Sequence, residues 1–150
     1  MPRGVSGGNA LVRIVADTNT VVSGLLWSGP PQQVINAARE KRITLYSSVV
    51  LTAEFAEVIG REQFAKRLRA AELSAAELVS DYARLAKLVI PANINPTVAG
   101  DADDDQVLAC ALAAGADAIV SGDKHLRNLK TYQNISIVSA AEALARLSHP

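Results

Sequence analysis

Residues 101–123 read DADDDQVLACALAAGADAIVSGD, and this stretch decides the class of fold. Acids open it, an alanine-rich apolar run follows, and Gly115 ends that run, so we predict a helix over residues 103–114. The short apolar run 118–120 then predicts a buried strand, which stops just before Asp123. A helix that leads directly into a buried strand is typical of α/β proteins.

The same alternation of helix and strand extends through the rest of the chain. Ser74 and Ser139 each stand three residues before a glutamate, a pattern that opens a helix with a capping box. The apolar and β-branched runs predict further strands at 11–16, 43–46, 88–90 and 135–138. Helices are predicted at 31–41, from Ser47 or Ser48 to about Ile59, within 61–88, and from Ser139 onward. We therefore expect an α/β fold, a three-layer α/β/α sandwich around a mainly parallel sheet of about five strands.

Composition places the chain among globular proteins. Its 150 residues are 49% hydrophobic and 20% charged, enough to bury one core. Residues 1–10 are rich in glycine and are expected to form a flexible leader, and residues 11–150 a single domain. The single cysteine, Cys110, excludes a disulfide framework and a cysteine-rich zinc site. With no apolar run long enough to span a membrane, we expect a cytoplasmic protein that has no membrane partner.

Acidic residues fall where a parallel sheet would bring them together. Asp17 directly follows the first predicted strand and Asp123 follows the fourth, so both belong at the edge formed by the carboxyl ends of the strands. Glu54 lies on the helix after the second strand, on the side that carries its apolar residues. Four more acids open the helix before the fourth strand: Asp101, Asp103, Asp104 and Asp105. One cavity could collect an acid from each of these four places.

Each acid also has a purely structural interpretation. Asp17 could be a turn or cap residue, and Glu54 could be a solvated helix residue. An acid at a helix N-terminus stabilises the helix by about 0.3–1 kcal/mol. Capping explains one or two of the four acids at 101–105, and we expect Asp103 in the cap position. Between Asp104 and Asp105 the choice stays open, because apolar residues follow both at helical spacing.

Carboxylates gathered at one edge of a sheet predict a divalent cation, because their mutual repulsion destabilises the fold unless a cation offsets it. A set of oxygen ligands without Cys or His favours Mg²⁺ or Mn²⁺ over Zn²⁺. Such ions can orient a water and polarise a phosphodiester. Basic clusters stand at 39–42, 61–69 and 124–130, and each is either a solvated surface or an anion-binding site.

Four stretches, taken in chain order, resemble the PIN-domain family, most of all bacterial and archaeal PIN proteins that are toxins of toxin–antitoxin pairs. They are VADTN at 15–19 with Ser23-Gly24, residues 47–59, residues 101–112, and AIVSGDKHL at 118–126. Together they extend over about residues 11 to 147.

The resemblance implies a Mg²⁺- or Mn²⁺-dependent ribonuclease, in which a metal-activated water attacks an RNA phosphodiester. It implies that Asn19 and Ser121 support the metal site by hydrogen bonding. The metal-binding acids it implies are Asp17, Glu54, Asp104 or Asp105, and Asp123. It further implies that the basic clusters hold the RNA, that a cognate antitoxin protein is a partner, and that the chain forms a homodimer or higher homo-oligomer, for which 61–88 is the expected interface.

Two other classes of function compete with the nuclease. A PIN scaffold could act as a binding module that docks an antitoxin or an RNA with little hydrolysis, although the presence of all four acids counts against it. A phosphoryl-transfer or receiver-type domain would use Asp17 as nucleophile or phosphoacceptor. Asn19 stands where a haloacid-type phosphatase needs a second acid, and a receiver's acid pair near the first strand is missing.

Overall fold

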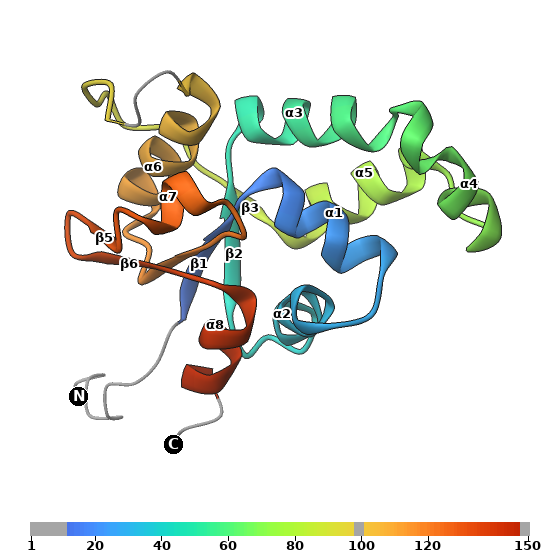
Figure 1. Cartoon of the computed structure of the whole chain (residues 1–150), viewed down its shortest axis with the longest axis horizontal. Helices are drawn as coiled ribbons and strands as arrows, with labels where there is room; N and C mark the ends of the chain where they lie inside the picture. The colour runs from blue at the N-terminus through green and yellow to red at the C-terminus, as the bar shows by residue number, and fades with distance from the viewer. Residues whose placement is uncertain (1–11, 98–100, 148–150) are drawn as a thin grey trace.

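The computed structural model describes residues 12–97 and 101–147, so the leader predicted at 1–10 lies outside the described residues. Within them, strands and helices alternate along the chain (Figure 1). The strands are β1 (Arg13–Ala16), β2 (Thr44–Ser47), β3 (Lys87–Leu88), β4 (Ala118–Val120), β5 (Thr131–Tyr132) and β6 (Ile135–Val138). The helices are α1 (Thr18–Leu26), α2 (Pro30–Arg39), α3 (Val49–Ile59), α4 (Glu62–Ala70), α5 (Ala75–Leu85), α6 (Ala102–Ala114), α7 (Lys124–Arg127) and α8 (Ala140–Leu147).

The strands form one sheet in the order β3-β2-β1-β4-β6-β5. All neighbouring pairs are parallel except β5 and β6, which are antiparallel. The mainly parallel α/β/α sandwich is thus confirmed, and β5 adds a sixth strand that pairs through only two residues. The chain builds outward from β1 to β3 and then resumes at β4 on the other side of β1. This reversal makes the carboxyl ends of β1 and β4 the place where open α/β sheets bind ligands.

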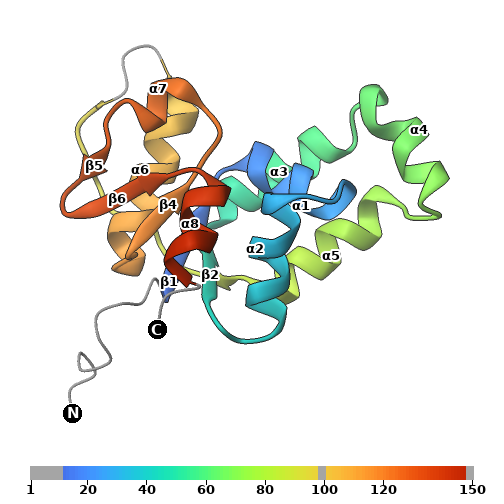
Figure 2. The same ribbon diagram turned by 60° about the horizontal axis from the view of Figure 1, so that its bottom comes forward.

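Alternate residues of the strands separate the two helical layers, as the two-residue period of a strand requires. Ile14 and Ala16 of β1 join a core with α1, α2, α3, α5 and α8. Val15, between them, joins a second core with α6 and α7. Figure 2 shows α8 and α2 side by side in the first layer, with α6 behind the strands on the other face. Helices therefore cover both faces of the sheet, and polar residues gather at the carboxyl ends of β1 and β4.

Polar side chains set the ends of the helices near this edge. Asp17 caps α1, because its Oδ1 accepts the N–H of Thr20, and Gly115 ends α6 in the left-handed conformation at φ 61°. The prediction that Asp103 caps the helix before the fourth strand, which is α6, is wrong. Asp101 is the cap, since the helix begins one residue earlier and Asp101 Oδ1 accepts the N–H of Asp104.

Helices α3 and α5 extend beyond the sheet and carry α4 at their far end, opposite β5 (Figures 1 and 2). The capping box predicted at Ser74 is present at the start of α5, and the equivalent pair of hydrogen bonds joins Ser139 and Glu142 at α8. Among the described residues, none of the helices combines the length and apolar character needed to cross a membrane.

Candidate metal centre

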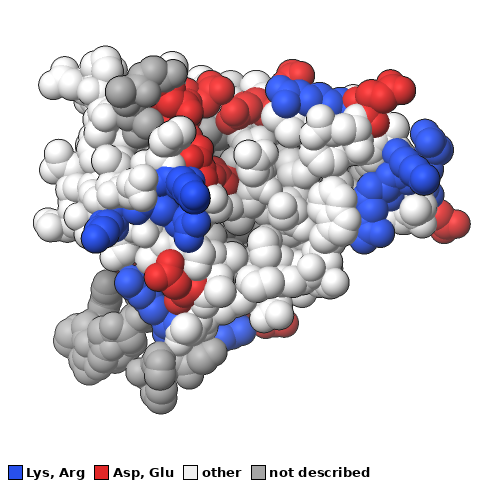
Figure 3. All heavy atoms as spheres, in the orientation of Figure 1, with Lys and Arg blue, Asp and Glu red and all other residues white. Residues whose placement is uncertain are grey.

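A cavity of about 220 Å³ opens at the carboxyl ends of β1 and β4. Its charged lining consists of five acids and one cation, and Figure 3 shows acids gathered on this part of the surface. The lining residues are Asp17, Thr18, Asn19, Glu54, Val58, Arg61, Asp103, Asp104, Val107 and Asp123. The fold thus brings together an acid from each of the four places that the sequence singled out.

Three carboxylates meet most closely at the start of α6 and the end of β4. One oxygen from each of Asp101, Asp104 and Asp123 lies within 4.8 Å of the other two. Asp104 is buried, with 7% of its surface exposed, and its Oδ2 has no hydrogen-bond partner among the described residues. A buried carboxylate oxygen without a donor is costly, and a cation is the partner that its position beside two other acids allows.

Asp17 is held by donors from two elements. Ser121, which follows β4, donates its hydroxyl hydrogen to Asp17 Oδ2 at 2.5 Å, and Thr20 of α1 donates its N–H to Oδ1 at 3.0 Å. The same Ser121 Oγ accepts the N–H of Asp123 at 2.9 Å. One serine therefore fixes the side chain of the first acid and the backbone of the last, which suits the supporting role expected of it.

Two residues separate Asp123 from the end of β4, and Asp123 caps the N-terminus of α7. Its Oδ1 accepts the N–H of His125 at 2.7 Å, and the His125 ring lies 3.8 Å from the same oxygen. The His125 side chain is exposed. One carboxylate oxygen thus orients the following turn, and Asp123 still contributes an oxygen to the three-acid cluster.

Glu54 reaches the cavity from α3. Thr18 Oγ1 donates a hydrogen bond to Glu54 Oε1 at 2.6 Å, so the first turn of α1 fixes this carboxylate. Burial raises the pKa of Glu54, the Thr18 hydrogen bond lowers it, and the charges of Asp103, Asp17 and Asp101 raise it again. The net effect is a raised pKa, as a carboxyl group surrounded by other acids should have.

Asp104 shows the electrostatic cost of the arrangement most clearly. Burial is the largest of the causes that raise its pKa to about 7, and the charges of Asp123 and Asp101, a hydrogen bond with Asp101 and the charge of Asp17 act in the same direction. Without a cation, this environment favours the protonated form of the carboxyl more than an exposed position would. A divalent cation would favour the ionised form and offset the repulsion.

Of the two candidates for the third acid, Asp104 faces the cavity and Asp105 does not line it. Both Asp105 carboxylate oxygens accept the N–H of Thr97, at 3.1 and 3.2 Å, in the segment before α6. Asn19 lines the cavity from an exposed position in α1. The roles of these residues in metal binding remain predictions.

The structure adds three residues that the sequence analysis did not single out for the site. Asp101 joins the three-acid cluster, Thr18 holds Glu54, and Arg61 is the one cation in the described lining of the cavity. The excess of acids over caps at 101–105 was a signal for Asp101. Nothing in the sequence marked Thr18, because its role depends on the packing of α1 against α3.

Comparison with known proteins agrees with this geometry. A family model of the PIN domain matches residues 13–125, so the chain belongs to the PIN-domain family. No curated protein and no solved structure matches the chain. The PIN domain is a nuclease fold, and the cluster of Asp101, Asp104 and Asp123 is compatible with the divalent metal that PIN nucleases use.

Proposed function

We propose that this protein is a Mg²⁺- or Mn²⁺-dependent ribonuclease that hydrolyses RNA phosphodiester bonds in the acidic cavity. The observation that carries the proposal is the unpartnered Oδ2 of the buried Asp104 beside Asp101 and Asp123. An all-carboxylate set of donors suits a hard cation such as Mg²⁺ or Mn²⁺. The family supplies the class of reaction, since the PIN domain is a nuclease fold.

The residues that would hold the cation are Asp104, Asp123 and Asp101, with Asp17 and Glu54 lining the rest of the cavity. When bound, a divalent ion supplies an activated water and stabilises the charge that develops on the phosphodiester. Ser121 and Thr18 keep Asp17 and Glu54 in fixed orientations through their hydrogen bonds. Preorganised acids of this kind need little rearrangement when substrate binds.

Arg61 supports a substrate that carries negative charge. It lines the cavity from the junction between α3 and α4 and forms an exposed ion pair with Glu57 at 2.6 Å. Exposed ion pairs are weak, about 0–1 kcal/mol, so an incoming phosphate could exchange for Glu57 at small cost. A phosphodiester beside the acids would then find one positive group on the rim and the cation within.

We also propose that the protein is the toxin of a toxin–antitoxin pair, with RNA as substrate and a cognate antitoxin protein as partner. The support for this is the resemblance of its four motif stretches, in order, to such PIN proteins. The same resemblance supports a homodimer or higher oligomer and a cytoplasmic location. Coexpression with a neighbouring gene product, followed by copurification and a growth assay, tests the pairing.

The ribonuclease is tested by following cleavage of a set of labelled RNAs with Mg²⁺, with Mn²⁺ and with EDTA. Glu54→Gln is the informative variant, and Glu72→Gln, at an exposed position after α4, is its matched control. We expect metal-dependent cleavage that Glu54→Gln lowers at least about tenfold and Glu72→Gln leaves nearly unchanged. Cleavage that survives EDTA, or that both variants retain, contradicts the proposal. Metal binding with no cleavage of any RNA would favour the binding module instead.

A further inference from the structure

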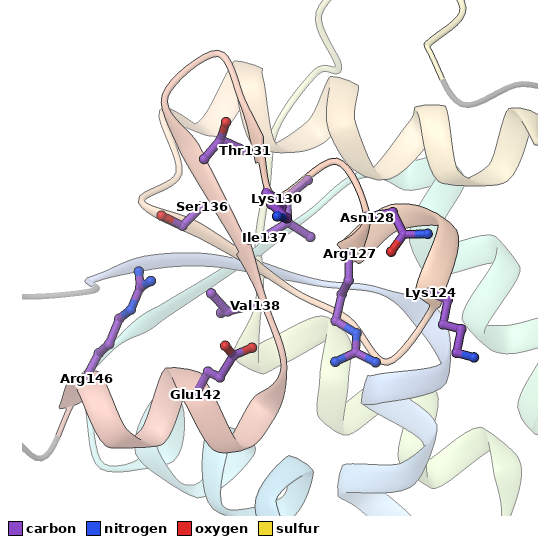
Figure 4. A pocket seen from close by; sticks show the side chains of 10 residues that line it. All are labelled: Lys124, Arg127, Asn128, Lys130, Thr131, Ser136, Ile137, Val138, Glu142 and Arg146. Carbon is purple, nitrogen blue, oxygen red and sulfur yellow. The ribbon is translucent and has the colours of Figure 1, made fainter.

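A second, larger cavity of about 750 Å³ lies between α7, β6 and α8. Its charged lining consists of four cations and one acid: Lys124, Arg127, Lys130, Arg146 and Glu142. In Figure 4 the Arg127 side chain extends from α7 toward α8, while Glu142 and Arg146 extend from α8 toward the sheet. The floor includes Ile137 and Val138 of β6, so the cavity is basic at its walls and apolar below.

The positive charge of this basic cavity is only partly offset within the part of the chain that the structure describes, because the one acid of its lining, Glu142, faces the charges of Arg127 and Arg146. None of its four cations lies within 4.0 Å of a described carboxylate. Glu142 is occupied, because its Oε1 accepts the N–H of Ser139 at the start of α8. The Arg127 Nε atom is buried and has no hydrogen-bond partner among the described residues. Buried donors are nearly always satisfied, so Arg127 keeps hydrogen-bonding capacity that the described residues do not use.

A third cavity, of about 230 Å³, shares one lining residue with the acidic cavity and another with the basic cavity, and is called the connecting cavity below. Asn19 lines both this connecting cavity and the acidic cavity. Arg127 lines both the connecting cavity and the basic cavity. Between them lie small residues, Ser121 and Gly122 on one side and Ala140 on the other. Figure 3 shows Lys and Arg side chains close to the acids on the same face of the molecule.

We propose that the basic cavity binds backbone phosphates of the single-stranded RNA that is cut at the metal centre, on one side of the scissile bond. The connecting cavity would take the nucleotide between the cut and the first of these phosphates. This inference rests on the proposed function, and it adds the direction in which the substrate leaves the acidic cavity.

The chemistry of the basic cavity favours a polynucleotide backbone over a single free anion. Guanidinium groups pair with phosphate oxygens through parallel hydrogen bonds, and Arg127 and Arg146 offer two such groups at separate places. One phosphate would engage only part of a cavity of about 750 Å³. A chain of phosphates linked by sugars would meet the separate cations and cover Ile137 and Val138 with its less polar atoms.

The test measures binding of a labelled single-stranded RNA of twelve nucleotides by fluorescence anisotropy, with Mn²⁺ present. Every protein carries Asp17→Asn, so that cleavage does not consume the probe and the result is separate from the test of catalysis. Lys130→Gln with Arg146→Gln removes two cations from the basic cavity. Arg84→Gln with Lys87→Gln removes two exposed cations of α5 and β3, outside the three basic clusters, and is the matched control.

We expect the cavity double variant to weaken RNA binding about tenfold at 0.1 M salt. The slope of log K against log salt should become shallower by about 1.4, since each phosphate contact to a single strand contributes about 0.7. The RNA affinity of the control double variant should stay within about twofold of that of the parent protein. Equal effects of the two pairs would mean that only overall charge matters and would overturn the proposal. If the protein without these substitutions cleaves RNA but the cavity double variant binds RNA as tightly as its parent, this inference is wrong and the proposed ribonuclease stands.

Two further experiments test whether the RNA runs through the connecting cavity and whether the basic cavity binds RNA phosphates or free phosphate. Ala140→Trp fills the connecting cavity without changing charge and should weaken binding of the twelve-nucleotide RNA several-fold. Arg127→Lys keeps the positive charge but loses the paired N–H donors of the guanidinium group, and it should weaken RNA binding less than Arg127→Gln. Inorganic phosphate at millimolar concentration should displace little RNA. Displacement by phosphate as effective as by unlabelled RNA would identify a free-anion site and contradict the proposal.

Discussion

Ser121, at the end of β4, donates its hydroxyl hydrogen to the Oδ2 of Asp17, at the end of β1, across 2.5 Å. The two residues are 104 positions apart in the sequence. Their bond exists because β1 and β4 are parallel neighbours at the reversal of strand order, and Asp17 N–H also bonds to the Val120 carbonyl at 3.1 Å. The acidic cavity is therefore built on the junction of β1 and β4, which backbone and side-chain hydrogen bonds both join.

Replacing Ser121 by alanine should cost both stability and activity. Asp17 Oδ2 would lose its donor and the N–H of Asp123 its acceptor, and an unsatisfied buried group costs about 1–3 kcal/mol. Urea unfolding measures the first effect and RNA cleavage the second. Ser47→Ala is the control, since this buried serine makes one long hydroxyl contact, 3.3 Å to Thr52. A Ser121→Ala loss no larger than that of the control would show that the bridge to Asp17 contributes little.

The stability of the metal-free protein should fall as pH rises. The pKa of Asp104 is about 7 in the folded protein against an ordinary value of 3.8, so the unfolded chain releases this proton first. The contribution is fully present below about pH 4 and is lost as pH rises through about 7. Urea midpoints measured in EDTA at pH 5, 6, 7 and 8 should decline, and Asp104→Asn should flatten the decline. A decline of equal steepness in the variant would assign the titration to other groups.

Thr18→Val should alter the pH dependence of cleavage. The substitution keeps the shape of the side chain but removes the donor that lowers the pKa of Glu54. We therefore expect the acid limb of the pH–rate profile to move to higher pH, with little change in the urea midpoint. Thr52→Val on α3 is the matched substitution outside the cavity. An unshifted acid limb would mean that Glu54 does not have to ionise for cleavage.

Gly24→Ala should destabilise the contact between α1 and α2. A Cβ atom at this position would lie 2.7 Å from Ile35 Cγ1 and 2.8 Å from the Pro31 carbonyl oxygen. Overpacking of this kind costs about 1–3 kcal/mol, which chemical unfolding should detect. Gly60→Ala, where the nearest atom is at 3.4 Å, should change stability by less than about 0.5 kcal/mol. Similar losses at both positions would show that the helices move apart easily.

The sequence was sufficient for the sheet and most of its helices, because buried strands and capped helices leave local signals. The runs at 118–120 and 135–138 became β4 and β6, and Ser74 and Gly115 mark helix ends as predicted. Helix α1 was missed. Its Thr, Val and Gly residues are weak helix formers, and it depends on the Asp17 cap and on packing against α2 and α3. Strand β5 and helix α7 are too short to show a period.

For the site, the sequence predicted which acids share an edge but not how they pair. Asp17 and Asp123 were placed by the strands they follow, and the strand order brings them together. The side of α6 that faces the cavity depends on where the helix begins. The cap at Asp101 sets that start, so Asp104 faces the acids and Asp105 faces Thr97. A difference of one residue, about 100° around the helix axis, could not be read from four acids within five residues.

The most direct test of the metal centre is calorimetric titration of the metal-free protein with Mn²⁺, comparing Asp104→Asn with Asp105→Asn. Both variants remove one negative charge from adjacent residues of α6, and only Asp104 presents an unpartnered buried oxygen to Asp101 and Asp123. We predict that Asp104→Asn weakens Mn²⁺ binding at least about tenfold, while Asp105→Asn changes it by less than about threefold. Equal affinities in the two variants, or a larger loss in Asp105→Asn, would contradict the proposed centre.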